Sequence, residues 1–241
     1  MTSISINSAR QWLKTSQHPF AQMSFGICMW LRHFELPAPR ILYGAIYYVH
    51  RLVTMAVSAS VRVLYWTPIF KSRTTQAGKQ LYLYGGMPYL SGPLEIRYGN
   101  KCRISGQTTF SGRAASPSVP LLTLGDNVDV GWQSTIAVGT QVVIGNNVRI
   151  AGNAFIAGYP GHPVSAADRA AGLHDMDYQV GDIIIEDDVW IATGVTILPN
   201  VRIGKRAIIA TGSVVTTDIP ADTLAGGVPA RVIKSLIKLE Q

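Results

Sequence analysis

An aliphatic side chain recurs at every sixth position in the C-terminal part of the chain. The unbroken series is Ile185, Ile191, Ile197, Ile203, Ile209 and Val215. A six-residue period fits neither the 3.6-residue period of a helix nor the two-residue alternation of a strand. A backbone meets it when each hexapeptide is a short strand plus a sharp corner, so that three hexapeptides close a triangular coil around the aliphatic residues. The repeat therefore predicts a parallel β-helix.

The same spacing extends upstream in a less regular form. Leu124, Val130 and Ile136 keep it, and Ile144, Ile150 and Ile156 resume it after a gap. Residues 99–104 (GNKCRI) are similar to residues 145–150 (GNNVRI), which predicts a recurring coil corner. Residues 111–120, rich in Ser, Gly, Ala and Pro, predict a loop ejected from a coil. We place the domain boundary in the turn-rich stretch 81–93 and predict a β-helix domain over residues 85–241.

Residues 1–84 differ in charge and pattern. They hold nine Lys or Arg residues and one acid, Glu35, whereas residues 85–241 hold 12 basic and 13 acidic residues. The region is apolar and aromatic, and it lacks the hexapeptide period. We predict helices here, with Pro19 and Pro39 in the first turns of two of them and Thr67-Pro68 at the end of the second.

Three arginines of this second helix, Arg40, Arg51 and Arg62, stand eleven residues apart, so they form one stripe. The runs between them have ten residues each, and a membrane-spanning helix needs about 20 apolar residues. Two interpretations stay open. The helix lies on an anionic membrane surface as a peripheral element, or it is a collar packed on the solenoid or on a sister subunit. We expect no nucleic-acid partner, because no binding motif accompanies the charge.

The repeat stops after Ile156 and resumes at Ile185, which predicts a long loop over residues 157–184 containing Gly158-Tyr159-Pro160-Gly161-His162-Pro163. A loop of this length in a regular solenoid is usually functional or disordered. The imidazole of His162 is suited to accepting a proton from a hydroxyl at neutral pH. Cys28 and Cys102 show no metal-ligand spacing, and no secretory signal precedes the chain, so we expect a cytoplasmic setting.

Three motifs carry a family resemblance: His162-Pro163 followed by Asp168-Arg169 and Gly172-Leu173, then the coil 187–192 (DDVWIA), then residues 212–220 (GSVVTTDIP) continuing to 227–233 (GVPARVI). Together they resemble the hexapeptide-repeat acyltransferases, and within them the maltose- and galactoside-type sugar O-acetyltransferases. The match covers roughly residues 94–235. It implies a mainly β fold, a left-handed parallel β-helix with the N-terminal helical extension and a short C-terminal helix. The handedness comes from the resemblance alone, since it opposes the usual crossover preference.

The resemblance also implies a homotrimer with active sites between subunits, acetyl-CoA as donor and no metal. His162 would be the general base for direct attack of an acceptor hydroxyl on the thioester, with no acyl-enzyme. Asp168 and Asp175 are both candidates for orienting the imidazole.

The family positions that approach the pantetheine chain of CoA correspond to Ala192, Thr193, Ala210 and Thr211, although Ala192 and Ala210 are equally explained by coil packing. Those near its nucleotide end correspond to Thr216, Thr217, Arg231 and Lys234, with Thr217 standing where a lysine is common. We expect the acceptor to contact Trp132, Gln133, Tyr159 and Trp190; packing between subunits is the alternative for Trp190.

The coils before the loop lack an acidic residue that the sugar enzymes tend to have, which indicates an acceptor other than a free small sugar. We therefore expect an O-acetyltransferase of cell-envelope or exopolysaccharide biosynthesis that acts on a sugar, sugar-nucleotide or lipid-linked saccharide. A xenobiotic acetyltransferase that modifies an antibiotic is the alternative. A γ-class carbonic anhydrase needs three imidazoles on zinc, and only His162 and His174 follow residue 50.

Overall fold

The structure, a computed structural model, describes residues 6–237 and divides into two compact units, residues 1–54 and 55–241. The first unit contains α1 (Ile6–Thr15), α2 (Pro19–His33) and the start of α3 (Arg40–Val61). Pro19 occupies the first turn of α2, and the Nδ1 atom of His18 accepts a hydrogen bond from the Phe20 N–H at 3.2 Å. The helices predicted around Pro19 and Pro39 are confirmed.

The end predicted for the second helix is wrong. From α3 the helix continues through a π-helical turn, η1 (Arg62–Trp66), into α4 (Thr67–Ser72). Pro68 has no N–H, and in an α-helix its ring would clash with the carbonyl four residues earlier. The wider turn before it, in which the Thr67 N–H bonds to the Arg62 carbonyl, accommodates both effects.

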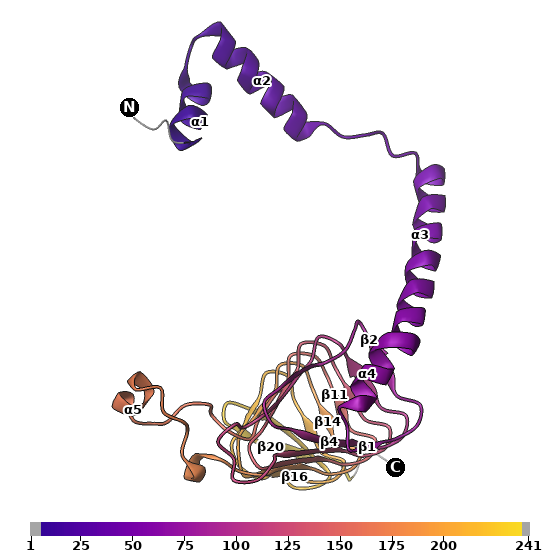
Figure 1. Cartoon of the computed structure of the whole chain (residues 1–241), viewed down its shortest axis with the longest axis vertical. Coiled ribbons are helices and arrows are strands. Elements are labelled where there is room, and N and C mark those ends of the chain that lie inside the picture. The colour runs from indigo at the N-terminus through magenta and orange to yellow at the C-terminus, as the bar shows by residue number, and fades with distance from the viewer. Residues whose placement is uncertain (1–5, 238–241) are drawn as a thin grey trace. The chain divides into compact units, whose positions relative to one another are not determined.

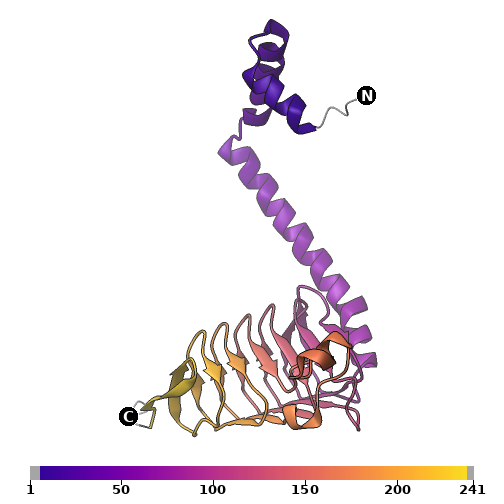
Figure 2. The ribbon, with the colours of Figure 1, turned by 90° about the vertical axis from the view of Figure 1, so that its left-hand side faces the viewer.

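The second unit is a parallel β-helix of three sheets (Figures 1 and 2). Sheet A contains β1 (Gln76–Ala77), β4 (Glu95–Tyr98), β7 (Leu121–Leu124), β10 (Gln141–Ile144), β13 (Ile183–Ile185) and β16 (Val201–Ile203). Sheet B contains β2 (Tyr82–Tyr84), β5 (Arg103–Ser105), β8 (Asp129–Val130), β11 (Arg149–Ile150), β14 (Trp190–Ile191), β17 (Ile208–Ile209), β19 (Thr223–Gly227) and β20 (Ala230–Ser235). Sheet C contains β3 (Tyr89–Ser91), β6 (Thr109–Gly112), β9 (Thr135–Val138), β12 (Phe155–Ala157), β15 (Thr196–Ile197) and β18 (Val214–Val215).

The aliphatic ladder forms the core, as predicted. All six residues from Ile185 to Val215 are fully buried, and those of the upstream series are at most 2% exposed. The parallel registers Ile185↔Ile203 and Ile191↔Ile209 stack equivalent residues of successive coils directly on one another. Phe70 of α4 belongs to the same core and lies against the ring of Tyr98, with 5.9 Å between the ring centroids.

The β-helix begins earlier than the predicted boundary at residues 84/85. β1 and β2 pair with β4 and β5, so the first coil starts at Gln76. Leu81 and Leu83 are buried in the core, and the glycines that follow them form a corner of this coil. The turn-rich composition therefore marks a corner within the solenoid.

The similar segments 99–104 and 145–150 occupy the same corner, between sheets A and B. The Asp126 N–H donates to Asn146 Oδ1 at 2.8 Å, and the Asn146 N–H donates to Asp187 Oδ1 at 2.7 Å. The Asn100 amide donates to Asp126 Oδ1 at 3.1 Å. This ladder of Asn and Asp side chains satisfies backbone donors that the strands leave unpaired at the corner.

The predicted C-terminal helix is not found in the described part of the chain. Residues 230–235 form β20, which turns back antiparallel on β19 and closes sheet B. The last residues, 238–241, lie outside the described residues. The reversal begins at the Gly226-Gly227 pair, where the positive φ of Gly227 permits a tight return.

Replacing Ile203 by alanine removes a fully buried ladder residue. We expect it to lower the free energy of unfolding by about 2–5 kcal/mol, since the coils cannot collapse into the cavity. Chemical denaturation measures the effect. Ile233→Ala is the matched control, because this isoleucine is 61% exposed. Equal losses in the two variants would contradict a core built on the ladder.

Candidate active site

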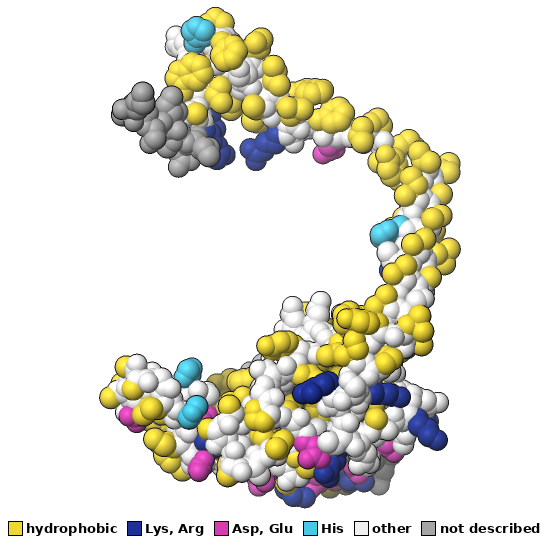
Figure 3. Space-filling view, viewed as in Figure 1, with side chains coloured by type: hydrophobic (Ala, Val, Ile, Leu, Met, Phe, Trp, Pro, Cys, Tyr) yellow, Lys and Arg dark blue, Asp and Glu magenta, His cyan; other side chains and the backbone are white. Residues whose placement is uncertain are grey.

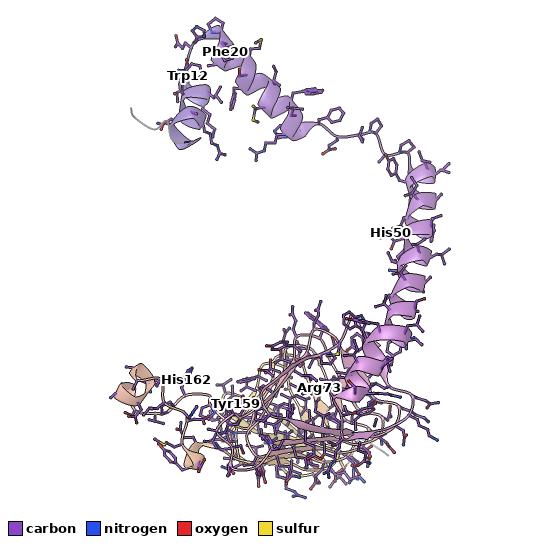
Figure 4. The ribbon with its side chains drawn as sticks, in the orientation of Figure 1. Trp12, Phe20, His50, Arg73, Tyr159 and His162 are labelled. Atoms are coloured by element: carbon purple, nitrogen blue, oxygen red, sulfur yellow. The ribbon has the colours of Figure 1, made fainter. Side chains whose placement is uncertain are left out.

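The loop that carries His162 leaves the β-helix at the corner between sheets C and A. It starts after β12 at Gly158, returns at Gly181 and contains the short helix α5 (Ala166–Ala170) and a 3-10 turn (Asp177–Gln179). Gly139 and Gly158 are in close contact at the point of departure, where a Cβ on Gly139 would lie 2.4 Å from the Gly158 carbonyl oxygen. Figure 4 shows His162 on the projecting loop. Its side chain is exposed.

A second loop, residues 113–120, leaves the same corner two coils earlier. It follows β6 directly, and the Arg113 N–H bonds to the carbonyl of Val138 at the end of β9. The loop that composition predicted over residues 111–120 is thus confirmed, apart from its first two residues, which belong to the strand. The two excursions therefore leave the same edge of the solenoid, separated by the corner between β9 and β10.

A buried ion pair joins these two loops. The Arg113 Nε donates to Asp175 Oδ1 at 2.6 Å, and its Nη2 donates to the Asp175 carbonyl oxygen at 2.8 Å. Both side chains are only 4% exposed. Arg113 Nη1 also donates to Asp177 Oδ1 at 2.8 Å, but this carboxylate is 81% exposed. The charged pair is fully hydrogen-bonded, which a buried pair requires if its desolvation is to be offset.

The electrostatics of Arg113 reflect both burial and pairing. Burial by itself lowers the pKa of the guanidinium, and the hydrogen bonds to Asp175 and Asp177 outweigh this effect and raise the pKa above its ordinary value. The guanidinium is therefore charged at neutral pH.

The backbone around His162 is held from three sides. The Gly161 N–H donates to Asp175 Oδ2 at 3.1 Å, and Gln179 Nε2 donates to the His162 carbonyl at 3.3 Å. Arg169 Nη1 donates to the Pro163 carbonyl at 2.9 Å. These contacts orient the peptide groups and leave the imidazole facing solvent. A side chain that reacts with a substrate must be accessible, and the exposed position of His162 on the loop meets this requirement.

The two candidates for orienting the imidazole have different surroundings. Both carboxylate oxygens of Asp175 are used, one by Arg113 and one by the Gly161 N–H. Asp175 therefore positions the backbone of the loop. Asp168 stands in the first turn of α5, where its N–H bonds to Ser165 Oγ at 3.3 Å. Neither carboxylate bonds to the His162 ring in the hydrogen bonds of the described residues.

Several of the predicted CoA residues form a column along the opposite corner, between sheets B and C. The Asn153, Gly194 and Gly212 N–H groups bond to the carbonyls of Trp132, Gly152 and Thr193, which aligns successive coils there. Ala192, Thr193, Ala210 and Thr211 lie in this column, and Trp132 and Gln133 lie two coils before Thr193. Gln133 is in the left-handed region, with φ +56°, because it makes the corner.

A basic group stands at the end of this column. A Cβ on Gly226 would lie 2.9 Å from the Cβ of Ala210, and Gly226 pairs with Arg231 across β19 and β20. Lys234 is on the same strand and is exposed. Small side chains followed by exposed basic side chains suit an extended ligand that has phosphate groups at one end.

Other predicted residues lie elsewhere. Thr216 and Thr217 follow β18 at the corner between sheets C and A, on the edge from which the His162 loop departs. Tyr159 lies at the base of that loop, where its hydroxyl donates to Ser111 Oγ at 3.2 Å. Trp190 is on the outer face of sheet B, in a groove of about 470 Å³ that Ile208 and Leu236 also line. Thus the predicted residues divide between the two edges of sheet C and the face of sheet B, and one chain does not bring them together.

Sequence reasoning missed Arg113, Asp177 and Gln179. The one signal for Arg113 was its place at the start of the ejected loop, and an arginine in a polar loop is ordinarily solvated. Its burial follows only from the approach of residue 175, which is 62 positions away. Among the residues that the structure describes, no group of three His, Cys, Asp or Glu side chains could hold a metal ion.

Comparison with known proteins matches residues 182–217 to the family "Bacterial transferase hexapeptide (six repeats)". This segment is similar to the hexapeptide repeats of bacterial transferases. It coincides with the ladder from Ile185 to Val215 and with β13 to β18. The chain resembles the hexapeptide-repeat acetyltransferases of the sugar O-acetyltransferase type.

Two relatives illustrate the range of this resemblance. The galactoside O-acetyltransferase of Escherichia coli is 39% identical over 114 residues, which are 47% of this chain and 53% of that protein. A 2,3,4,5-tetrahydropyridine-2,6-dicarboxylate N-acetyltransferase of Staphylococcus aureus is 40% identical over 96 residues, which are 40% of this chain and 34% of that protein. The chain thus spans about half the length of the first relative and about a third of the second. An O- and an N-acetyltransferase match at nearly the same identity, so similarity alone does not identify the acceptor.

Among solved structures, the N-acyltransferase AntD of Bacillus cereus, in complex with dTDP-4-amino-4,6-dideoxyglucose and coenzyme A, has a TM-score of 0.56. It is 19% identical, and the match covers 72% of this chain and 92% of that one. At this identity the likeness shows that the two chains share a fold.

Removing one partner of the Arg113–Asp175 pair leaves a buried charge uncompensated. We expect Asp175→Asn or Arg113→Met to destabilise the loop attachment by about 3–5 kcal/mol. Chymotrypsin should then cleave faster at Leu173 or Tyr178, both exposed in this loop. The double variant Arg113→Met/Asp175→Leu should be closer to the native rate than either single variant.

Asp177→Asn is the matched control for this experiment, because its carboxylate contacts the same guanidinium from a solvated position. It should change the cleavage rate little. Additive losses in the double variant would show that the ion pair does not connect the loops.

Proposed function

We propose that the protein is an acetyl-CoA-dependent O-acetyltransferase that modifies a sugar hydroxyl in cell-envelope or exopolysaccharide biosynthesis. One observation supports this proposal most directly. Three hydrogen bonds hold the backbone around His162, which leaves its side chain exposed on the loop that interrupts the hexapeptide β-helix. The galactoside O-acetyltransferase relative supports a sugar acceptor. A sugar nucleotide or a lipid-linked saccharide in the cytoplasm is the acceptor we favour.

The reaction we propose is a single displacement. The imidazole of His162 accepts the proton of the acceptor hydroxyl while its oxygen attacks the thioester carbonyl of acetyl-CoA. A tetrahedral oxyanion forms, and backbone N–H groups or water stabilise it. The C–S bond then breaks, and the CoA sulfur leaves with the proton from the imidazole. The ester and free CoA are the products, and no acyl-enzyme forms.

The column from Thr193 to Arg231 fits the donor. Ala192 and Ala210 have small side chains where an extended pantetheine chain would need close access to the backbone, and Thr193 and Thr211 are exposed beside them. Arg231 and Lys234 would meet the phosphates. Acetyl-CoA supplies the activated acyl group, and this chain's residues orient it.

The separation of His162 from this column supports a homotrimer. Copies of the chain placed around a threefold axis would bring the His162 edge of one subunit against the Thr193 edge of the next. Each active site would then need two chains. In keeping with the family resemblance, we propose a left-handed coil for each subunit.

The acceptor region supports a substrate other than a free small sugar. Val138 and Gly139, at positions that precede the catalytic loop, are buried, while Trp132 and Gln133 are exposed. No carboxylate stands at these four positions to bind sugar hydroxyls. Mass spectrometry of acceptors incubated with acetyl-CoA tests this part, and a gain of 42 Da on an antibiotic instead of a saccharide would contradict it.

Replacement of His162 by alanine should lower the turnover number by roughly 10² to 10⁴-fold, since a general base is lost. Release of free CoA thiol measures the rate. His174→Ala is the matched control, because this histidine is exposed in the same loop, and it should keep most of the activity. An active His162→Ala enzyme with an unchanged oligomeric state would refute the mechanism.

Mixed oligomers test whether the active site is shared. Thr193→Trp should block acetyl-CoA by filling the column, and His162→Ala should remove the base. If each site combines two subunits, random mixing of the two inactive variants restores about a quarter of the sites. A site within one chain would leave the mixture inactive, since every chain carries one defect. Equilibrium binding of acetyl-CoA confirms that only Thr193→Trp loses the donor.

A further inference from the structure

The helix that runs from Arg40 to Ser72 exposes an apolar surface along its length. It has 33 residues and contains an 18-residue window with a mean hydropathy of 1.3, so by length and composition alone it is able to cross a membrane. None of the residues of α3 is buried. Figure 3 shows hydrophobic side chains along the whole of α3. An apolar surface of this extent on a water-soluble protein normally meets a partner or a membrane.

The three arginines of this helix form one narrow stripe, whereas the polar residues His50 and Ser60 lie outside it, about 100° and 180° from Arg51. At about 100° per residue, Arg40, Arg51 and Arg62 fall within roughly 40° of one another. Thr54 and Ser58 lie beside them on the same side. Most of the remaining circumference is apolar, and its exposed members include Ile41, Leu42, Ile46, Val49, Leu52, Val53, Val57 and Leu64.

Contacts at the C-terminal end of the helix show which way the arginine stripe faces. The Arg62 guanidinium lies 4.5 Å from the centroid of the Tyr82 ring, on the first coil of the β-helix. Trp66 packs against the core, whereas Leu64 is 78% exposed. Within the second unit, then, the stripe faces the solenoid at Arg62 and an apolar side faces away from it.

The charge of the region selects among the classes of partner. Between Glu35 and Glu95 the sequence has no acidic residue, and it has six basic ones. An anionic bilayer attracts such a segment. A second copy of the same helix packed on the apolar side would leave the arginine stripe without an anionic counterpart, which a bilayer of anionic lipids supplies. Tyr43, Tyr47, Tyr48, Tyr65 and Trp66 add the aromatic rings that are enriched at membrane interfaces.

The position of Arg51 distinguishes a spanning helix from an interfacial one. In any apolar stretch of about 20 residues centred on α3, Arg51 would lie near the middle of the hydrocarbon, where an arginine is strongly unfavourable. In the plane of the interface, the arginine stripe instead remains at the level of the headgroups while the apolar side enters the acyl chains.

We propose that the helix Arg40–Ser72 lies in the interface of an anionic bilayer, with its arginine stripe toward the headgroups and water. This inference does not rest on the enzymatic activity. It provides the β-helix with a membrane attachment through its first coil.

Binding of the full chain to vesicles tests the proposal. Vesicles of phosphatidylcholine with 30% phosphatidylglycerol should bind the protein much more tightly than phosphatidylcholine alone, and added salt should weaken the binding. Arg40→Gln/Arg51→Gln should weaken it roughly 25-fold, about fivefold for each charge. Lys79→Gln/Lys101→Gln, with the same loss of charge outside the helix, is the matched control and should have a smaller effect.

Thiol labelling establishes the orientation. In a Cys28→Ser background, Ser58→Cys lies in the stripe and Val53→Cys lies on the apolar side. With anionic vesicles, a membrane-impermeant maleimide should label position 58 and not position 53. Protection of both would show a spanning helix, and labelling of both at the rate found without vesicles would show a helical collar or a contact between subunits. Either result would overturn the proposal.

Discussion

The stacking of one aliphatic side chain on the next, coil after coil, is the interaction on which the structure depends. Ile185, Ile203 and their equivalents are in parallel register, so each buried side chain contacts its counterparts in the coils before and after it. Because each strand has only two to five residues in most coils, no coil buries its own apolar side. The hydrophobic free energy is therefore a property of the stack. The length and sequence of a corner can therefore vary as long as the strands before and after it keep their register.

This freedom explains how the candidate active site is built. Two loops leave the same corner of the prism without disturbing the register, since β10 still pairs with β13 across the long excursion. Outside the stacked coils, these loops lack the aliphatic packing that orders the strands. The buried Arg113–Asp175 pair and the contacts around Gly161 and Pro163 supply that order. A rigid scaffold thus carries a loop whose conformation depends on a few polar contacts.

The triangular cross-section has a second consequence. It places His162 and the Thr193 column on different edges of sheet C, which is why the reaction that we propose uses residues of two chains. The helix Arg40–Ser72 meets the solenoid at its first coil, where Phe70 and Trp66 join the core. The proposed sites for the donor, the acceptor and the membrane therefore lie on separate parts of one repetitive framework. Such separation lets each part change without altering the core.

The sequence by itself determined the β-helix, its inward residues, the recurring Gly-Asn corner, the two excursions and the exposed loop histidine. These features are local or strictly periodic, and an aliphatic residue every six positions has no other regular backbone to satisfy it. The tertiary structure decided the start of the first coil at Gln76, the strand β20 in place of a helix, and the burial of Arg113. It also decided which edge each predicted site residue occupies. Those outcomes depend on contacts between residues far apart in the chain, such as positions 113 and 175, whose proximity exists only after the coils have stacked.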